Sequence, residues 1–310
     1  MKASKISFGG KVRYSTGTFA IKYTAMRYWL FLTLLIFTLT VMAQKRDRKL
    51  EAALAALLQP HKGVAGIYVM NLKNGNTAAY NADTLFPTAS MVKVPILVGV
   101  MQKIKEGSLK YTDELVYKDS LLYEGVDILG SFKNEEKIEL GKVMMLMLTM
   151  SDNTASLWLQ SLAGTGTRIN ELMQGLGLQH TRVNSRTPGR EEARKTYGWG
   201  QTTPKEMATL FQLLWQGKVI DDSSSKRMLR LLSRNFWDDV AISAIPATVF
   251  VASKNGAVDG SRSEVLLVNG KTPYIFCICT KNNIDTSWTD NNEAWQMTKK
   301  VSQLLWQHFN

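Results

Sequence analysis

The stretch "TASMVKV", residues 88–94, places Ser90 three residues before Lys93 and opens the apolar run "PILVGVM". Residues three apart in a helix share a face, so the hydroxyl of Ser90 and the amine of Lys93 are expected to be neighbours. Pro95 is tolerated only near a helix start, because it has no N–H to donate. The stretch therefore predicts the first turn of a buried helix that carries a serine and a lysine side by side.

This pair is either a nucleophile with its base or an ordinary helix start. Burial of the apolar run would draw Lys93 into low dielectric and lower its pKa, which makes a neutral, basic amine available. Free N–H groups at a helix start can also bind a developing anion. However, the same pattern recurs at Ser223 and Lys226 in the polar stretch "DDSSSKR", where it indicates a solvated helix cap. The motif alone leaves both interpretations open.

The N-terminal segment has the features of an export signal. Arg27 precedes an apolar run, residues 29–42, and "VMA" ends a small-residue cleavage site at Ala43. We therefore expect residues 1–43 to be a signal peptide and the mature protein to be periplasmic or secreted. A membrane span needs about 20 apolar residues, so no stable span is expected after cleavage; an uncleaved anchor is the alternative.

Composition and charge narrow the class of protein. The chain has 310 residues, 45% of them hydrophobic, enough for one large domain or two interleaved ones. Residues 1–43 hold six positive and no negative charges, so their removal lowers the net charge from +12 to +6. That excess favours anionic ligands and predicts no nucleic-acid partner. Cys277 and Cys279 alternate in "YIFCICT" and are expected to be core residues of a strand.

The periodicities predict helices at both ends and in the middle, with strands between them. A helix over 47–59 precedes two strands within 63–83, joined by an Asn-Gly turn. Helical spacing follows over 138–150, 153–164, 167–177 and 204–217, and strands return after residue 240 before a last amphipathic helix. This order predicts an α+β fold, layered α/β/α: an antiparallel sheet of about five strands flanked by the terminal helices, with an inserted all-helical domain.

Two further stretches change the interpretation of Ser90. "TMSDNTA" sets Ser151, Asp152 and Asn153 at the junction of two predicted helices, and "VASKNGAVDG" sets Lys254 at the end of a strand. Alone, the first indicates a helix cap and the second a turn. Together, at gaps of about 60 and about 100 residues, the three stretches resemble Ser-x-x-Lys, Ser-Asp-Asn and Lys-Thr-Gly of the penicillin-recognising serine hydrolases. The chain from about residue 45 to its end is similar to class A β-lactamases.

The resemblance implies a role for each matching residue. Ser90 would attack a carbonyl and form an acyl-enzyme, and Lys93 would take its proton or tune the field around it. Ser151 would pass a proton to the leaving nitrogen. Asn153 would hold the substrate amide and orient Lys93.

The third motif would bind the substrate. Lys254 would attract the substrate carboxylate and support the proton relay, with Asn255 and Gly256 beside it. Backbone N–H groups of the nucleophile and of Ala257 would form an oxyanion hole, which is worth about 3 kcal/mol per donor. Arg262, in "DGSR", would read the substrate carboxylate; a surface arginine is the alternative.

One loop departs from the family. In "TRVNSRTPGREEARKTYGWGQTTP", residues 181–204, the position of the deacylating glutamate holds Thr187, which is no general base near neutral pH. The next carboxylates are Glu191 and Glu192. Glu191 is either a relocated base that acts through a water or, like its neighbour, a solvated loop acid.

Two smaller departures concern the loop closure and the third motif. The positions of the salt bridge that closes the family's loop hold Ser185 and Gly200, and Asn255 stands where the family has threonine. Asparagine can still donate a hydrogen bond to a carboxylate. Acylation machinery is therefore expected to be complete, whereas deacylation is open.

We accordingly expect a serine hydrolase that acts without a metal or organic cofactor. The three histidines lie outside every motif, so a Ser-His-Asp triad is not expected, and no zinc spacing, Gly-x-Ser-x-Gly elbow or phosphate loop occurs. The substrate is expected to be a small molecule, a β-lactam or a D-Ala-D-Ala-like peptide, and the protein a monomer. The predicted domains are residues 44–87 with 233–310 (α/β) and residues 88–232 (all-α), with the active site at their interface.

Overall fold

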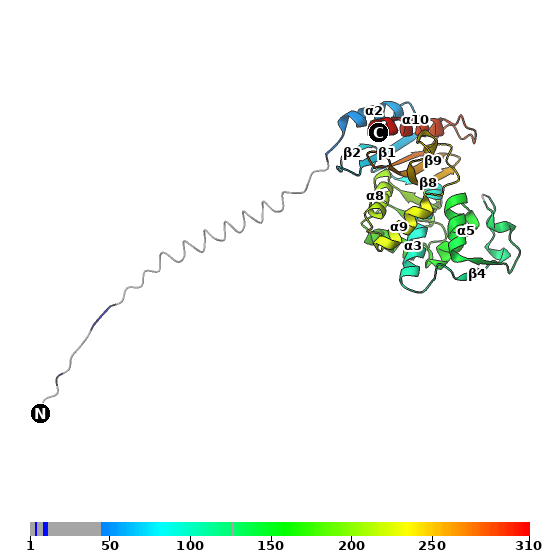
Figure 1. The fold of residues 1–310 in the computed structure, drawn as a ribbon, viewed down its shortest axis with the longest axis horizontal. Coiled ribbons are helices and arrows are strands. Elements are labelled where there is room, and N and C mark those ends of the chain that lie inside the picture. Colours follow the sequence, from blue (N-terminus) through cyan, green and yellow to red (C-terminus); the bar gives the residue numbers. More distant parts are fainter. Residues whose placement is uncertain (1–3, 5–8, 12–44, 126) are drawn as a thin grey trace. The chain divides into compact units, whose positions relative to one another are not determined.

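The computed structural model describes residues 4, 9–11, 45–125 and 127–310. The chain divides into two units, Met1–Gln44 and Lys45–Asn310, and the fold below is that of the second (Figure 1). The predicted signal peptide, residues 1–43, lies almost entirely outside the described residues. Within those described ranges, no helix has the length and apolar character needed to cross a membrane.

A five-stranded antiparallel sheet forms the middle of the fold, in the order β2-β1-β10-β9-β8. The first hairpin turns at the predicted Asn-Gly pair, where Gly75 has φ +74°, and the Asn71 side chain accepts from the N–H groups of Lys73 and Asn74. Strands from both ends of the chain therefore pair in one sheet. Their bounds are Val64–Asn71 (β1), Thr77–Tyr80 (β2), Phe250–Val258 (β8), Ser261–Asn269 (β9) and Tyr274–Lys281 (β10).

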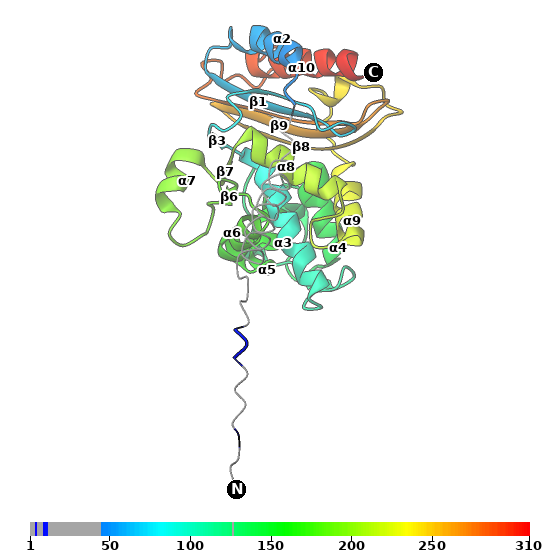
Figure 2. The same cartoon turned by 90° about the vertical axis from the view of Figure 1, so that its left-hand side faces the viewer.

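Two terminal helices cover one face of this sheet (Figure 2): α2, Arg48–Leu58, and α10, Glu293–Phe309. Leu50, Leu54 and Leu58 recur every four residues on α2 and are buried with inward-facing strand residues and with α10. The side chain of Asp47 caps the start of α2, and that of Asn292 caps α10.

Helices from the middle of the chain cover the other face (Figure 2). Residues 93–101 of α3 are buried all round, as the apolar run predicts, and α8 packs on β1 and β10. The helices of the middle of the chain are α3 (Lys93–Lys105), α4 (Leu140–Met145), α5 (Asn153–Leu162), α6 (Thr165–Gly175), α7 (Glu191–Tyr197), α8 (Pro204–Trp215) and α9 (Asp222–Leu232), and α8 and α9 contact the sheet itself. Short strands lie between them: β3 (Phe86–Pro87), β4 (Glu114–Val116), β5 (Lys137–Glu139), β6 (Arg182–Val183) and β7 (Gly200–Thr202).

The layered α+β class is confirmed. Two local predictions, on the cysteines and on residues 138–150, can also be compared with the structure. Cys277 and Cys279 are buried and unbridged on the face of β10 toward the middle helices, with their sulfurs 3.7 Å apart. The single helix predicted over 138–150 is instead α4 followed by a π-helix, Leu146–Met150. The division of the chain into two domains with the site between them stays a prediction.

Candidate active site

Ser90 lies in a 3₁₀-helix, Ala89–Val92, that leads directly into α3. Ala89, the residue before Ser90, has φ +43°, a left-handed conformation that costs a non-glycine residue about 1–3 kcal/mol. The turn is held because Thr88 donates its N–H to the carbonyl of Gly200 and accepts from Met91 N–H. The surrounding structure thus fixes a strained backbone next to the predicted nucleophile.

Strand β8 approaches this turn more closely than a side chain would allow. A Cβ on Gly256 would lie 2.3 Å from the carbonyl oxygen of Thr88 and 2.8 Å from the backbone nitrogen of Ser90. Only glycine permits this contact, which brings the strand that carries Lys254 against Ser90. Ala257 follows on the same strand and is partly buried.

Lys93 is fully buried and joins the first two motifs. Its Nζ lies 2.9 Å from Ser90 Oγ, 3.0 Å from Ser151 Oγ, 2.6 Å from Ser151 O and 3.0 Å from Asn153 Oδ1. Burial, assisted by the charge of Lys254, holds the pKa of the Lys93 amine well below its ordinary value, although Asp152 opposes the shift. A neutral amine at this point can accept the proton of either hydroxyl.

In the Ser-Asp-Asn stretch, Ser151 contacts the site lysine, whereas Asp152 stabilises the surrounding backbone. Ser151 ends the π-helix with φ +62°, and this left-handed turn accompanies the approach of its hydroxyl and carbonyl to Lys93. Asp152 points elsewhere: it caps α5 through Ala155 N–H and accepts from the N–H groups of Ile128 and Leu129. The helix-cap interpretation therefore holds for the aspartate alone.

Lys254 is also fully buried. Its Nζ donates to the carbonyl of Asn255 at 2.9 Å and to the Oδ1 of the same residue at 3.1 Å. Burial lowers the pKa of Lys254 to about 7, against the attraction of Glu264. Asn255 thus positions the lysine in this structure.

The second Ser-x-x-Lys pair has none of these features. Ser223 and Lys226 are exposed on the first turns of α9, and Lys226 pairs with Asp222 at 2.7 Å. Asp221 caps the helix through Ser224 N–H. The solvated-cap interpretation of this stretch is confirmed.

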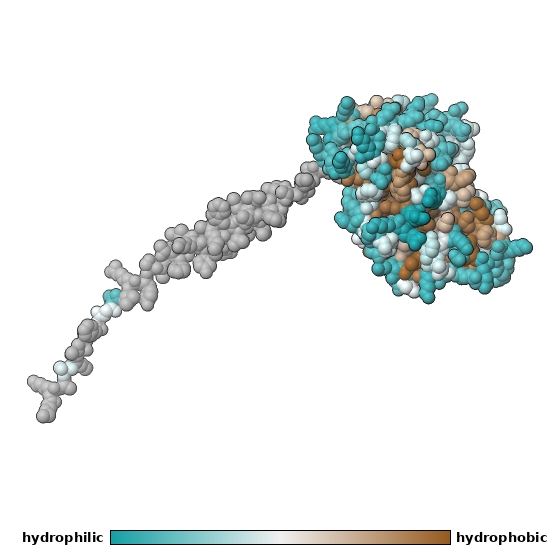
Figure 3. Space-filling view, in the orientation of Figure 1, coloured by the Kyte–Doolittle hydropathy of each residue, from teal (hydrophilic) through white to brown (hydrophobic). Residues whose placement is uncertain are grey.

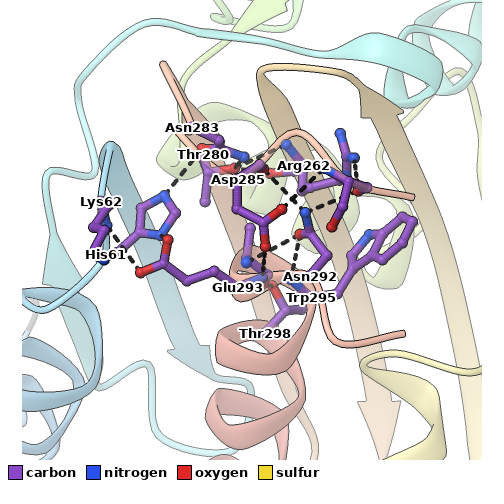
Figure 4. Close-up of polar contacts among 12 residues, drawn as sticks. His61, Lys62, Arg262, Thr280, Asn283, Asp285, Asn292, Glu293, Trp295 and Thr298 are labelled. Carbon is purple, nitrogen blue, oxygen red and sulfur yellow. Dashed lines mark hydrogen bonds and ion pairs between the residues drawn. The ribbon is translucent and has the colours of Figure 1, made fainter. Parts of the chain in front are cut away.

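Arg262 corrects one prediction. Gly256 faces the Ser90 turn and pairs with Ser263, so Arg262 points to the opposite face of the sheet. There it is 2% exposed and lies between the rings of Trp288 and Trp295. It donates to the carbonyls of Val258 and Ser287, within the polar network of α10 that Figure 4 shows. It is a buried scaffold residue, so the surface alternative is wrong, and the structure does not bring Arg262 together with Ser90, Lys93 and Ser151.

Hydrogen bonds to side chains hold the loop over residues 181–204. Gln160 on α5 donates to the carbonyl of Ser185 at 2.6 Å and accepts from its hydroxyl at 2.9 Å. Arg190 bridges Asn184 and Gln201. These contacts hold the loop in place of the family's salt bridge, which the sequence predicted to be absent. No sequence motif predicts them.

The two deacylation candidates on this loop differ in their surroundings. Thr187 is buried, and its hydroxyl donates to the carbonyl of Ser185. Glu191 begins α7, is exposed and accepts from Gly189 N–H at 3.0 Å. In the part of the chain that the structure describes, no hydrogen bond joins Glu191 to Ser90, and its catalytic role stays a proposal.

An aromatic pair that no sequence motif predicted lies close to this site. Tyr123 and Trp199 meet edge to face with ring centroids 5.0 Å apart, and Tyr123 N–H donates to Thr154 on α5. On the face drawn in Figure 3, other hydrophobic residues reach the surface over the helical region between hydrophilic ones. Hydrogen bonds bring Ser90, Ser151 and Asn153 together around the buried amine of Lys93, with Lys254 electrostatically coupled to it.

Comparisons with known proteins agree with this arrangement. A sequence model described as the Beta-lactamase enzyme family matches residues 49–309. β-Lactamase ROB-1 of Haemophilus influenzae is 24% identical over 265 residues, 82% of this chain and 84% of that protein. A β-lactamase of Streptomyces fradiae is 24% identical over 274 residues, 85% of this chain and 88% of that protein.

Solved structures share the fold. PBP-A superposes with a TM-score of 0.76 at 23% identity, covering 86% of this chain and 97% of that one. A β-lactamase from Chitinophaga pinensis gives the same TM-score at 18% identity, covering 84% of this chain and 100% of that one. At such identities the likeness establishes the common fold.

Proposed function

This chain belongs to the β-lactamase enzyme family, and we propose that it is an exported serine hydrolase that opens β-lactam rings through an acyl-enzyme on Ser90. The observation that carries the proposal is the buried Lys93 amine, 2.9 Å from Ser90 Oγ and 3.0 Å from Ser151 Oγ. A base with a lowered pKa beside a serine hydroxyl is what nucleophilic catalysis requires.

Acylation follows from these contacts. Neutral Lys93 takes the proton of Ser90 as its Oγ attacks the lactam carbonyl, and the N–H groups of Ser90 and Ala257 stabilise the developing oxyanion. The proton then passes through Ser151 to the nitrogen that leaves as the ring opens. Lys254 attracts the substrate carboxylate, with Asn255 and Gly256 lining the same edge, and Asn153 holds the substrate amide.

Deacylation separates this function from its alternatives. A water must attack the Ser90 ester, and Glu191 is the proposed base for that step. Thr187, buried and bonded to Ser185, favours a second candidate: a penicillin-binding protein that acylates without turnover, or a DD-carboxypeptidase or esterase. Among the similar structures, one is a leucine-to-glutamate mutant of PBP-A as an acyl-enzyme complex with penicillin G.

Time-resolved mass spectrometry of the intact protein tests the proposal. Residues 44–310 are mixed with excess penicillin or a cephalosporin and followed from seconds to hours. An adduct that forms and clears as drug is consumed supports a β-lactamase, and Glu191→Gln should then slow the clearing. An adduct that persists indicates a penicillin-binding protein, and release of D-Ala from a cell-wall peptide analogue indicates the carboxypeptidase.

Two serine variants make the assignment specific. Ser90→Ala should abolish the adduct, whereas Ser223→Ala, in the exposed copy of the motif, should acylate like the parent. Turnover of β-lactams by Ser90→Ala would end the proposal. Export is tested separately, by expressing the full chain and sequencing the N-terminus of the mature protein, which should begin after Ala43.

A further inference from the structure

Residues 235–237, "NFW", form a short segment between α9 and β8, and its first residue contacts the strand that carries Lys254. The Nδ2 of Asn235 donates to the hydroxyl of Ser253 at 3.0 Å. Ser253 is buried and immediately precedes Lys254 on β8. The Oδ1 of Asn235 accepts from the N–H of Trp237 at 3.2 Å, so one side chain fixes both the strand contact and the turn of the segment. One end of the segment is therefore anchored beside the third motif.

The other end of the segment is anchored beside Ser151. The N–H of Phe236 donates to the carbonyl of Thr149 at 3.1 Å. The indole Nε1 of Trp237 donates to the carbonyl of Met150, also at 3.1 Å. Thr149 and Met150 are the last residues of the π-helix, and Ser151 follows them directly. Residues 235–237 thus cross from the strand of the third motif to the turn that carries the second.

The two rings of this segment reach the surface, although both are large and apolar. Phe236 is 59% exposed and Trp237 is 38% exposed. Their ring centroids lie 5.4 Å apart and their planes meet at 89°, an edge-to-face contact. The hydrogen bonds of the segment hold its backbone and the indole in place, so that little side-chain freedom is left to lose when a ligand binds. A rigid, exposed aromatic pair is a typical binding surface.

The position of this pair relates it to one half of the substrate. In the proposed acylation, Ser151 passes a proton to the leaving nitrogen, and Lys254 attracts the substrate carboxylate. In penicillins and cephalosporins both of these groups belong to the ring that is fused to the lactam. That ring and its substituent would therefore lie between Ser151 and Lys254, which is the interval that residues 235–237 span.

We propose that Phe236 and Trp237 form a subsite that selects β-lactams with a flat aromatic group on the fused ring. This inference rests on the proposed function, because it uses the roles of Ser151 and Lys254. An aromatic substituent gains ring contacts and covers exposed apolar surface, whereas a methyl group gains little of either. Phe236 has no side-chain hydrogen bond to lose, so its variants report the ring contact alone.

The test compares two cephalosporins that share one acyl side chain. One carries an arylvinyl group on the fused ring and the other a methyl group at the same carbon. The second-order rate constant of acylation is measured for each by time-resolved mass spectrometry of the intact protein, so that deacylation does not enter. Phe236→Ala should slow the arylvinyl compound by about two- to tenfold and leave the methyl compound within about twofold of the parent. Equal losses with both compounds, or no loss with either, would overturn the proposal.

Two further variants separate the ring contact from a merely structural effect. Phe250→Ala is the matched control, because Phe250 is also exposed, at 41%, but begins β8 about 13 Å from Lys254 along the strand. It should leave both rate constants unchanged. Phe236→Tyr keeps the ring and should keep the preference. If Phe250→Ala lost the preference, or if Phe236→Tyr lost it as Phe236→Ala does, contact with the Phe236 ring would not be its source.

Binding to the Ser90→Ala protein keeps this inference separate from the proposed function. If the parent forms no adduct with either compound, the proposed function fails, and the dissociation constants of the Ser90→Ala protein, measured by calorimetry, decide the subsite. Adding Phe236→Ala should then weaken the binding of the arylvinyl compound alone. An absence of binding, or a loss shared by both compounds, would reject the subsite. Adducts that form at a ratio unchanged by Phe236→Ala would leave the proposed function standing and the subsite refuted.

Discussion

Gly256→Ala should separate the strand of Lys254 from the Ser90 turn. The new Cβ would lie 2.3 Å from Thr88 O, 2.8 Å from Ser90 N and 3.0 Å from Met91 N. Ordinary contacts start near 3.4 Å, so the strand or the turn must move by about 1 Å. A misplacement of that size at a reacting centre costs about 100-fold in rate. Overpacking should also lower the unfolding free energy by about 1–3 kcal/mol.

Stopped-flow acylation with a chromogenic cephalosporin and thermal unfolding measure both effects. Gly260→Ala is the control, because it lies on the same hairpin and its Cβ would meet nothing within 4 Å. It should match the parent in both assays. If Gly256→Ala acylated as fast as Gly260→Ala, the close contact would not hold the two motifs together, and the geometric argument would be refuted.

Three further predictions follow from individual contacts. Arg262→Met removes a buried hydrogen-bond donor from the carbonyls of Val258 and Ser287, so it should lower the unfolding free energy by about 1–3 kcal/mol in chemical denaturation, yet leave KM for a carboxylate-bearing β-lactam unchanged. The acylation rate should be bell-shaped in pH. It rises as Lys93, whose pKa is lowered, loses its proton, and it falls around pH 7 as Lys254 loses its own, which a stopped-flow series can measure. Asp152→Asn removes the charge that raises the pKa of Lys93, so the acid limb of that profile should move to lower pH; an unmoved limb would contradict this assignment.

Local sequence patterns predict the features of the structure that depend only on neighbouring residues. Ser90 and Lys93 are three residues apart at the start of an apolar run, so one helix turn is enough to make them neighbours. The strands and most helices likewise follow from periodicity and turn residues. The approach of Ser151 could be inferred only from motif order, because it depends on a π-helix and a left-handed residue that no periodicity announces.

Arg262 shows where such reasoning fails. Its role depends on which face of β9 it occupies, and the register of the β8–β9 hairpin decides that. A shift of one residue moves every side chain of a strand to the other face. The two hydrogen bonds between Gln160 and Ser185 could not be predicted from the sequence either, because tertiary packing brings together residues that are 25 apart in the chain. Motif matching identifies residue types, whereas register and packing decide what they touch.

The geometry of Thr187 bears directly on deacylation. A Cβ on Gly166 would lie 1.8 Å from the Thr187 hydroxyl, so the glycine of α6 leaves the space that the threonine fills. The hydroxyl also donates a hydrogen bond to the carbonyl of Ser185 at 2.8 Å. A glutamate is longer by two heavy atoms and would have to leave this space. The loop is therefore built around a small residue at position 187, and a deacylating base must come from another position, or the acyl-enzyme persists.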